Sequence, residues 1–408
     1  MQGLAPWISG EPRALPTASR RRRQLMEINR KVHNLIHAGP FLRNAIESRN
    51  LQVLSSMLGP AYRGIIAQNG KAARQSAVEC GHDALFSWSY ERDKPEMARL
   101  YEHAKKMQWN AATDIDWKLQ LDPDDDGTGL LPDHYLPVLP LPSWRALTPG
   151  QKREQRRALL AWLLSQFLHG EQGALFAAAQ IIEAVPWMDA KLFGSTQVVD
   201  EGRHVEVFHT YLTTKLEKMY EINDSLYVII DSVCGEPAWD MKFLGMQIMV
   251  EGLALGAFTS LRQATREPLL QSILKSVVSD EARHVKYGVV ALRSLYEQQI
   301  QERERRYRED WVWEVALQMR NRFLAHEFYD EYYGHLMSRR RWDQLVLGSP
   351  LMSLFRRAMF KRIVPNLVKL GLLSDRVKPR YAALGVLEFQ DAKAATELTA
   401  EEMLSEAS

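Results

Sequence analysis

The sequence predicts an all-α protein: a four-helix bundle with extra N- and C-terminal helices. Apolar residues recur at helical spacing through long segments of the chain. No stretch of any length shows the alternation of apolar and polar residues that is typical of strands. The helical patterns cover residues 21–38, 94–108, 150–185, 189–219, 239–265, 268–299, 301–329 and 341–372.

These patterns divide the chain into five parts. Four long helical patterns follow one another between residues 150 and 299, with breaks at Pro186, around 223–237 and at Pro268. The residues from 391 onward are rich in Ala and Glu, so we expect a frayed end there. The expected parts are an N-terminal helical extension (1–108), a Pro-rich connecting segment (109–150), the bundle (151–300), C-terminal helices (301–375) and a tail (376–408).

The connecting segment is the part least compatible with helix. Six of the 18 prolines of the chain fall within residues 121–150, a density that no long helix tolerates. We therefore expect an extended stretch that wraps on the core, and we expect its aromatic and polar portion, residues 109–117, to close one end of the bundle. The segment ends at Thr148-Pro149, an N-cap followed by proline at the first helical position.

Composition excludes several classes of protein. The chain has 408 residues, of which 46% are hydrophobic and 25% charged, and its formal net charge is +2. Disordered and disulfide-scaffold proteins do not have this composition, and a nucleic-acid binder would need a marked excess of basic residues. Only Cys80 and Cys234 are present, which fits a reducing cytoplasm. Residues 1–23 carry no apolar run, so we expect no secretory signal and no transmembrane segment there.

A duplicated motif gives the first indication of function. Residues 200–205 read DEGRHV, and residues 280–285 read DEARHV. Each copy places a glutamate and a histidine three residues apart, so both side chains leave the same face of a helix. A single Glu-x-x-His is weak by itself, because the pattern often occurs on solvated faces.

The surroundings of these residues are apolar. Glu281 and His284 interrupt a stripe of apolar residues along 268–299, and Glu171 and Glu251 interrupt similar stripes on the first and third helices. Burying lone carboxylates in such stripes is unfavourable by several kcal/mol unless positive charge compensates. Four carboxylates and two imidazoles that converge are matched best by a pair of metal ions.

The spacing of the glutamates indicates that they do converge. Glu171 and Glu201 are 30 residues apart, and so are Glu251 and Glu281. If each pair belongs to an antiparallel hairpin that turns at its midpoint, both glutamates lie at one height, about 22 Å from the turn. Two such hairpins bring four glutamates and two histidines to one level, which is the ligand set of a dinuclear carboxylate site.

Residues 150–300 resemble the ferritin-like di-iron carboxylate proteins, because the duplicated Asp-Glu-x-Arg-His is specific for that superfamily. The resemblance implies a cofactor of two iron ions, with a manganese–iron pair as the alternative. It also implies that Asp200 and Asp280 orient the histidines across the bundle and that Arg203 and Arg283 balance the buried carboxylates. The implied metal ligands are Glu171, Glu201, His204, Glu251, Glu281 and His284.

Residues next to the implied ligands distinguish this chain from three related branches of the superfamily. Ribonucleotide reductase small subunits usually carry a tyrosine one turn after the first histidine, where this chain has Phe208. Aryl-amine N-oxygenases add a histidine one turn before the last glutamate; Val277 stands there, which counts against close membership. Multicomponent hydroxylases typically place a threonine where this chain has Leu255. After these comparisons, the class that remains is an oxygen-activating oxidase or monooxygenase related to these branches.

We therefore expect a di-iron oxygenase that uses dioxygen to hydroxylate or N-oxygenate a small organic substrate, in a biosynthetic setting. The expected partners are the substrate, dioxygen, an electron donor such as a ferredoxin or reductase, and a second copy in a homodimer. Two alternatives stay open: a ribonucleotide-reductase-like radical or Mn/Fe subunit, and a non-enzymatic iron-binding protein. The amphipathic residues 351–372 pack on their own domain or, alternatively, rest on a membrane surface or dock an acidic electron donor.

Overall fold

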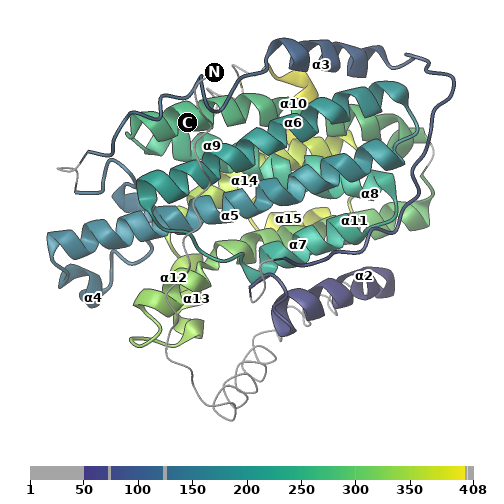
Figure 1. Cartoon of the computed structure of the whole chain (residues 1–408). Helices are drawn as coiled ribbons and strands as arrows, with labels where there is room; N and C mark the ends of the chain where they lie inside the picture. The colour runs from purple at the N-terminus through teal and green to yellow at the C-terminus, as the bar shows by residue number, and fades with distance from the viewer. Residues whose placement is uncertain (1–49, 72–74, 123–125, 299, 400–401, 403–408) are drawn as a thin grey trace, which may run out of the picture.

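The structure, a computed structural model, describes residues 50–71, 75–122, 126–298, 300–399 and 402, and over these residues the chain is helical with no strand (Figure 1). The helix predicted at 21–38 lies outside the described residues. The all-α prediction is confirmed. The four long helices are found close to their predicted bounds: α5 (Pro149–Ala184), α6 (Met188–Tyr211), the run from α8 to α9 (Trp239–Ala264) and α10 (Pro268–Gln298).

Local sequence sets the two ends of the first hairpin. Thr148 caps α5 by accepting a hydrogen bond from the backbone N–H of Gln151, whose own side chain accepts from the backbone N–H of Thr148. Pro149 then begins the helix at a position where no N–H is required. α5 ends at Ala184 and α6 begins at Met188, so the turn encloses Pro186 as predicted.

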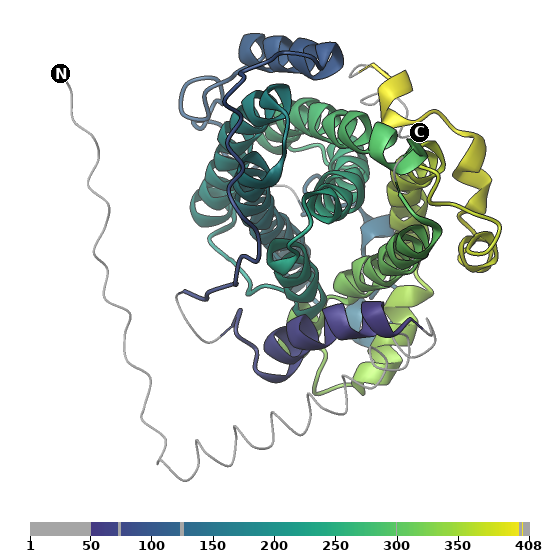
Figure 2. The same ribbon diagram turned by 90° about the vertical axis from the view of Figure 1, so that its right-hand side faces the viewer.

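The third long helix is the central helix of the molecule. It consists of α8 (Trp239–Phe243), a π-helical stretch η4 (Leu244–Val250) and α9 (Glu251–Ala264). Seen end-on, it is surrounded by the other helices (Figure 2). It is also the one described helix that is long and apolar enough to cross a membrane, but 94% of its most apolar window is buried inside the protein. Its apolar character is therefore explained by its position in the core.

One helix occupies a region that the sequence predicted to be a break. α7 (Asp224–Gly235) lies within residues 223–237, and Asn223 caps it by accepting from the backbone N–H of Ser225. Its apolar side chains are buried, and α2 (Leu51–Ala61) packs against it (Figure 1). The prediction of a break is wrong because polar and Gly/Pro residues at both ends of a short apolar run hid a helix of 12 residues.

The connecting segment follows α3 (Pro95–Lys106), and its described residues hold only short helices, η2 (Asp133–Tyr135) and α4 (Pro142–Arg145). Residues 109–117 were expected to close one end of the bundle, and the structure places them along its side and at one end. Gln108 and Trp109 bind Asp200 and Asp280, which lie in the middle of α6 and α10. The backbone oxygen of Trp117 accepts from Lys215 on η3 (Leu212–Leu216), directly after the end of α6.

The C-terminal helices cover the opposite side of the central helix. They are α11 (Glu302–Asn321), η5 (Arg322–Leu324), α12 (His326–Tyr332), α13 (Arg339–Leu347) and α14 (Pro350–Lys369). α14 turns its apolar stripe, which includes Phe355 and Ile363, into the core against α9, so the amphipathic pattern of 351–372 is packing within the chain.

The last described residues are packed rather than frayed. α15 (Lys378–Ala383), η6 (Leu387–Asp391) and η7 (Ala395–Glu397) follow α14. Tyr381 and Val386 are buried, and the backbone N–H of Ala395 donates to the side chain of Asn366 on α14. The expectation of a frayed end from residue 391 is wrong for the described residues through 399, because this stretch covers apolar surface of the C-terminal helices.

Candidate metal centre

The four long helices bring all six predicted site residues to one buried volume. Glu171 comes from α5, and Glu251 is the first residue of α9. The two Glu-x-x-His pairs come from α6 and α10. None of the six side chains is more than 5% exposed. The equal spacing of 30 residues in the two hairpins therefore places the residues at one height, as the sequence predicted.

The ligand atoms form two overlapping groups. One atom each from Glu171, Glu201, His204 and Glu281 lie within 4.8 Å of one another, and so do atoms of Glu201, Glu251 and His284. Glu201 belongs to both groups. Glu281 also lies between them, since its two oxygens are 3.2 Å from Nδ1 of His204 and 3.7 Å from Nδ1 of His284. This is the arrangement of two metal positions that share bridging carboxylates.

The far side of each histidine is held by an aspartate from the other motif. Nε2 of His204 lies 3.2 Å from Oδ2 of Asp280, and Nε2 of His284 lies 3.1 Å from Oδ2 of Asp200. Nε2 of each imidazole donates to the aspartate, and Nδ1 faces the glutamates. The two motifs thus fix each other's imidazoles across the bundle.

Arg203 and Arg283 tie the two aspartates together. Each guanidinium forms ion pairs with both Asp200 and Asp280. All four charged groups are buried, and their charges balance in pairs. Such a closed network satisfies the aspartates without drawing on the glutamates.

Two groups where the N-terminal extension meets the connecting segment complete this network, and sequence reasoning did not assign them. The indole Nε1 of Trp109 donates to Oδ2 of Asp280 at 2.8 Å, and the guanidinium of Arg203 lies 4.9 Å from the centre of the indole ring. The amide Nε2 of Gln108 donates to Oδ1 of Asp200 at 3.0 Å. No pattern in the sequence of an irregular segment indicates which buried group it will meet.

Gln197 is a further site residue that the sequence analysis missed. Its Nε2 donates to Oε1 of Glu251 at 2.7 Å and to Oε1 of Glu201 at 3.3 Å, and its Oε1 accepts from Nε2 of Gln247. The signal was present in the sequence, because Gln197 lies four residues before Glu201 and hence on the same face of α6.

Burial and mutual repulsion shift the protonation equilibria of the site. Burial raises the pKa of Glu171 well above its usual value, and repulsion from Glu281 adds to this. Burial raises the pKa of Glu251 in the same way. For Glu201, burial is outweighed by the imidazole of His284 and then by His204, so its pKa is lowered. Burial is also outweighed at His204 and His284, whose pKa values are raised by the surrounding carboxylates.

These residues fit a pair of metal ions, because several of their side-chain atoms lack a hydrogen-bond partner. Oε2 of Glu201, Oε2 of Glu251, both carboxylate oxygens of Glu281 and Nδ1 of His284 are buried without a hydrogen-bond partner. Buried polar atoms without partners are unfavourable in a folded protein. Carboxylate and imidazole donors aimed at one volume are suited to iron, and such metal–ligand bonds would satisfy these atoms together.

A small cavity of about 10 Å³ adjoins the cluster on its open side. Its charged lining consists of Glu171, Glu251, Glu281 and Arg322, and apolar side chains such as Phe167 and Phe258 form much of the rest. Arg322 begins η5, directly after α11, and is only 3% exposed. Sequence reasoning did not assign this residue.

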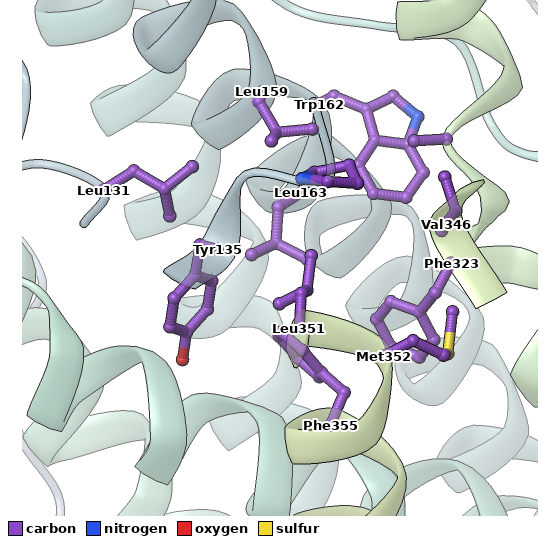
Figure 3. Close-up of a pocket in the computed structure, with 12 residues that line it drawn as sticks. Leu131, Tyr135, Leu159, Trp162, Leu163, Phe323, Val346, Leu351, Met352 and Phe355 are labelled. Carbon is purple, nitrogen blue, oxygen red and sulfur yellow. The ribbon is translucent and has the colours of Figure 1, made fainter. Parts of the chain in front are cut away.

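A second cavity of about 30 Å³ lies farther along the same face of α5 (Figure 3). It is lined by apolar and aromatic side chains, among them Leu159, Leu163, Phe323 and Phe355. Leu163 lies eight residues before Glu171, which corresponds to about 12 Å along the helix. None of the six site residues lines this second cavity.

Aromatic side chains pack beside the centre. Phe208, at the place where the radical-forming proteins carry a tyrosine, is fully buried against Phe167 and Phe258. A phenyl ring has no hydroxyl to oxidise, so this position cannot store a tyrosyl radical.

Comparison with known proteins adds a family assignment. A family model described as p-aminobenzoate N-oxygenase AurF matches residues 91–371, which is more than half of the chain. No match is found among the curated proteins. Two solved structures that resemble the chain are variants of an R2-like ligand-binding oxidase with an anaerobically reconstituted Mn/Fe cofactor. The first is 19% identical to this chain with a TM-score of 0.34, and the match covers 64% of this chain and 92% of the solved chain. The second is 17% identical with a TM-score of 0.38, and the match covers 68% of this chain and 98% of the solved chain.

Proposed function

The chain belongs to the p-aminobenzoate N-oxygenase AurF family, and on that premise we propose that its buried cluster holds two iron ions and oxidises a small organic substrate. Family membership makes the protein a dioxygen-dependent di-iron oxidoreductase. The observation that carries the site assignment is the convergence of six buried glutamate and histidine side chains, five of whose polar atoms have no hydrogen-bond partner.

Membership corrects one inference from the sequence. Val277 stands where aryl-amine N-oxygenases are expected to carry a histidine, and this difference counts against close membership. The family match spans that position, so the valine does not exclude membership. Val277 is fully buried on α10, one turn before Glu281.

Each site residue has a proposed role in holding the metal pair. Glu171 and His204 lie at one position, Glu251 and His284 lie at the other, and Glu201 and Glu281 lie between them. Asp200 and Asp280 keep the imidazole Nδ1 atoms aimed at the metals, and Arg203 and Arg283 neutralise these aspartates.

Bound iron(II) supplies electrons to dioxygen and so generates the oxidant for the substrate. The protein contributes positioning and exclusion of water. Gln197 holds Glu251 and Glu201 in place through its amide, and Phe167, Phe208 and Phe258 surround the open side with apolar surface. A site closed to bulk water protects the oxidant from side reactions. The substrate is proposed to undergo hydroxylation or N-oxygenation.

The two alternatives from the sequence are not favoured. A subunit that stores a tyrosyl radical beside the first histidine would need a tyrosine in place of Phe208, and a storage protein would not need the helices that surround the central bundle (Figure 2). The donor set also suits manganese in one position, so a Mn/Fe pair is the alternative cofactor.

The remaining partners are proposals as well. Turnover requires electrons, which we assign to a ferredoxin or reductase, and we also propose a homodimer. We place the protein in the cytoplasm, because Cys80 and Cys234 are both free.

Anaerobic reconstitution followed by a pulse of dioxygen tests this function. The protein is loaded with iron(II), the iron bound per chain is counted, and oxygen consumption is followed after mixing. We expect two irons per chain and rapid consumption of one dioxygen per metal pair. Uptake of iron far beyond two per chain would indicate storage, and a stable organic radical after the pulse would indicate a radical subunit; either result would refute the proposal.

A further inference from the structure

The two cysteines of the chain, Cys80 and Cys234, are far apart in the sequence and adjacent in the fold. An added Cβ on Gly81 would lie 3.6 Å from the backbone oxygen of Gly235, and one on Gly235 would lie 3.7 Å from the backbone oxygen of Glu79. The residues that flank the two cysteines are therefore in van der Waals contact. Both thiols are free; Cys80 is exposed, whereas Cys234 is buried near the end of α7.

A buried lysine connects the surroundings of the two cysteines. Lys242 on α8 is fully buried, and its Nζ donates to Oε1 of Gln180 at 2.6 Å and to the backbone oxygen of Cys234 at 2.8 Å. Nε2 of the same Gln180 side chain donates to Sγ of Cys80 at 2.9 Å. Burial lowers the pKa of Lys242, and the groups that oppose this most are Cys234 and then Cys80. The ammonium therefore lies within electrostatic reach of both thiols.

The ammonium of Lys242 is not neutralised by a carboxylate. Its hydrogen bonds go to uncharged oxygens, and no carboxylate among the described residues forms an ion pair with it. A buried cation in this position favours negative charge on a neighbouring sulfur, and the thiolate is the form of cysteine that attacks a disulfide. Burial nevertheless raises the pKa of the Cys234 thiol to about 11. Cys234 is therefore shielded from reagents in solution, and Cys80 is the sulfur that such a reagent reaches.

We propose that Cys80 and Cys234 form a redox-responsive pair, in which a small disulfide of the glutathione class modifies Cys80 and Cys234 then closes an intramolecular disulfide. In the first step the thiolate of Cys80 attacks one sulfur of the small disulfide, whose own S–S bond breaks as one thiolate leaves. In the second step the thiolate of Cys234 attacks Sγ of Cys80, and the second small thiolate leaves. The small disulfide gains two electrons, the two cysteines lose them, and the two cysteine protons pass to the departing thiolates.

Closure would tie an extended segment of the chain to α7. Residues 75–94 precede α3 and run without helix past the end of α5, where the backbone N–H of Leu85 donates to the backbone oxygen of Glu183 at 2.8 Å. Nε2 of His82 also lies 2.8 Å from the carboxylate of Glu183. A covalent link would turn these contacts into a clamp. None of the six metal-site residues takes part, so the inference does not depend on the proposed metal centre.

Oxidised glutathione, added to the full chain under nitrogen, tests the proposal through free-thiol counts and peptide mass mapping. We expect the wild type to lose both free thiols and to yield a peptide pair joined through Cys80 and Cys234. The closed form should unfold about 5 °C higher than the reduced form, because the cross-link closes a long loop of the unfolded chain. C234S should stop after the first step with one glutathione on Cys80, and C234A replaces it if C234S does not fold. C80S should lose its remaining thiol at least about tenfold more slowly, because Cys234 is buried.

C80S/D83C is the matched control. It keeps an exposed thiol on the same segment, but the thiol is moved three residues, or about 10 Å of extended chain, away from the contact with Gly235. We expect this variant to hold glutathione as a mixed disulfide and not to close.

Several outcomes overturn the inference. A wild type that keeps both thiols, or that holds glutathione on Cys80 without closing, shows that Cys234 is out of reach. A C80S variant that reacts as fast as the wild type contradicts the assigned order of the two cysteines. If C80S/D83C closes as completely as the wild type, the contact between the two segments does not select the pair. Equal unfolding temperatures of the closed and reduced forms contradict the clamp.

Discussion

Replacing Glu251 with glutamine is expected to stabilise the metal-free protein while it removes one of the two metal positions. Glu251 is 2% exposed; its Oε1 accepts from Gln197, but its Oε2 has no partner. A buried polar atom without a partner destabilises a fold by about 1–3 kcal/mol, and more if it is charged. Glutamine has nearly the same shape and no charge, so E251Q should raise the free energy of unfolding by about 1–3 kcal/mol.

The gain should depend on pH in a defined direction. Burial raises the pKa of Glu251 well above its usual value, so the folded metal-free protein retains a proton that the unfolded chain loses. This group's stabilising contribution is therefore present at low pH and is lost as the pH rises through the raised pKa. The E251Q variant has no carboxyl group at this position and does not lose stability in this way. Its gain in the free energy of unfolding over the wild type should therefore be small at pH 5 and largest at pH 8.

Urea unfolding with a chelator at both pH values measures this difference, and E206Q is the matched control because Glu206 is exposed on α6. Iron counting after reconstitution should give one iron per chain for E251Q and two for the control. A metal-free E251Q that is less stable than the wild type at pH 8, or that still binds two irons, would refute the reasoning.

Three further changes test other parts of the structure. D280N should weaken iron binding about tenfold to a hundredfold, because Asp280 orients His204, and competition with a chelator measures it; unchanged affinity would contradict that role. Iron(II) affinity should fall as the pH is lowered from 8 to 6, because the raised pKa values of Glu171, Glu251 and both histidines make protons compete with the metal; proton release on binding measures this competition, and its absence would argue against it. G256A should lower the free energy of unfolding by about 1–3 kcal/mol, since an added Cβ would lie 2.5 Å from the backbone oxygen of Ala358. G202A, where an added Cβ meets nothing within 4 Å, should show no packing penalty, and equal unfolding free energies for the two variants would disprove the close approach of α9 and α14.

The four long helices were predictable because each carries a long apolar face and ends at proline or polar turns. α7 was not, because its 12 residues are few and its longest apolar run, residues 226–230, is too short to show a helical period between Asn223 and Pro237. The packing of residues 376–399 also escaped prediction, since its short helices carry little periodicity, and their burial depends on surface offered by α14.

The site residues divide in the same way. Spacing alone brought the glutamates and histidines together, because helices are straight and antiparallel hairpins are symmetric about their turns. Gln197 could have been found from its position on the same helical face. Arg322, Gln108 and Trp109 could not, because they reach the centre from segments outside the four helices, and tertiary packing alone decides which segment passes the site.

The most direct test of the central claim is anomalous X-ray diffraction at the iron edge from crystals of the reconstituted protein. The account predicts two iron peaks per chain, one beside Glu171 and His204 and the other beside Glu251 and His284, with Glu201 and Glu281 between them. Peaks elsewhere in the chain, or a single peak at full reconstitution, would contradict it.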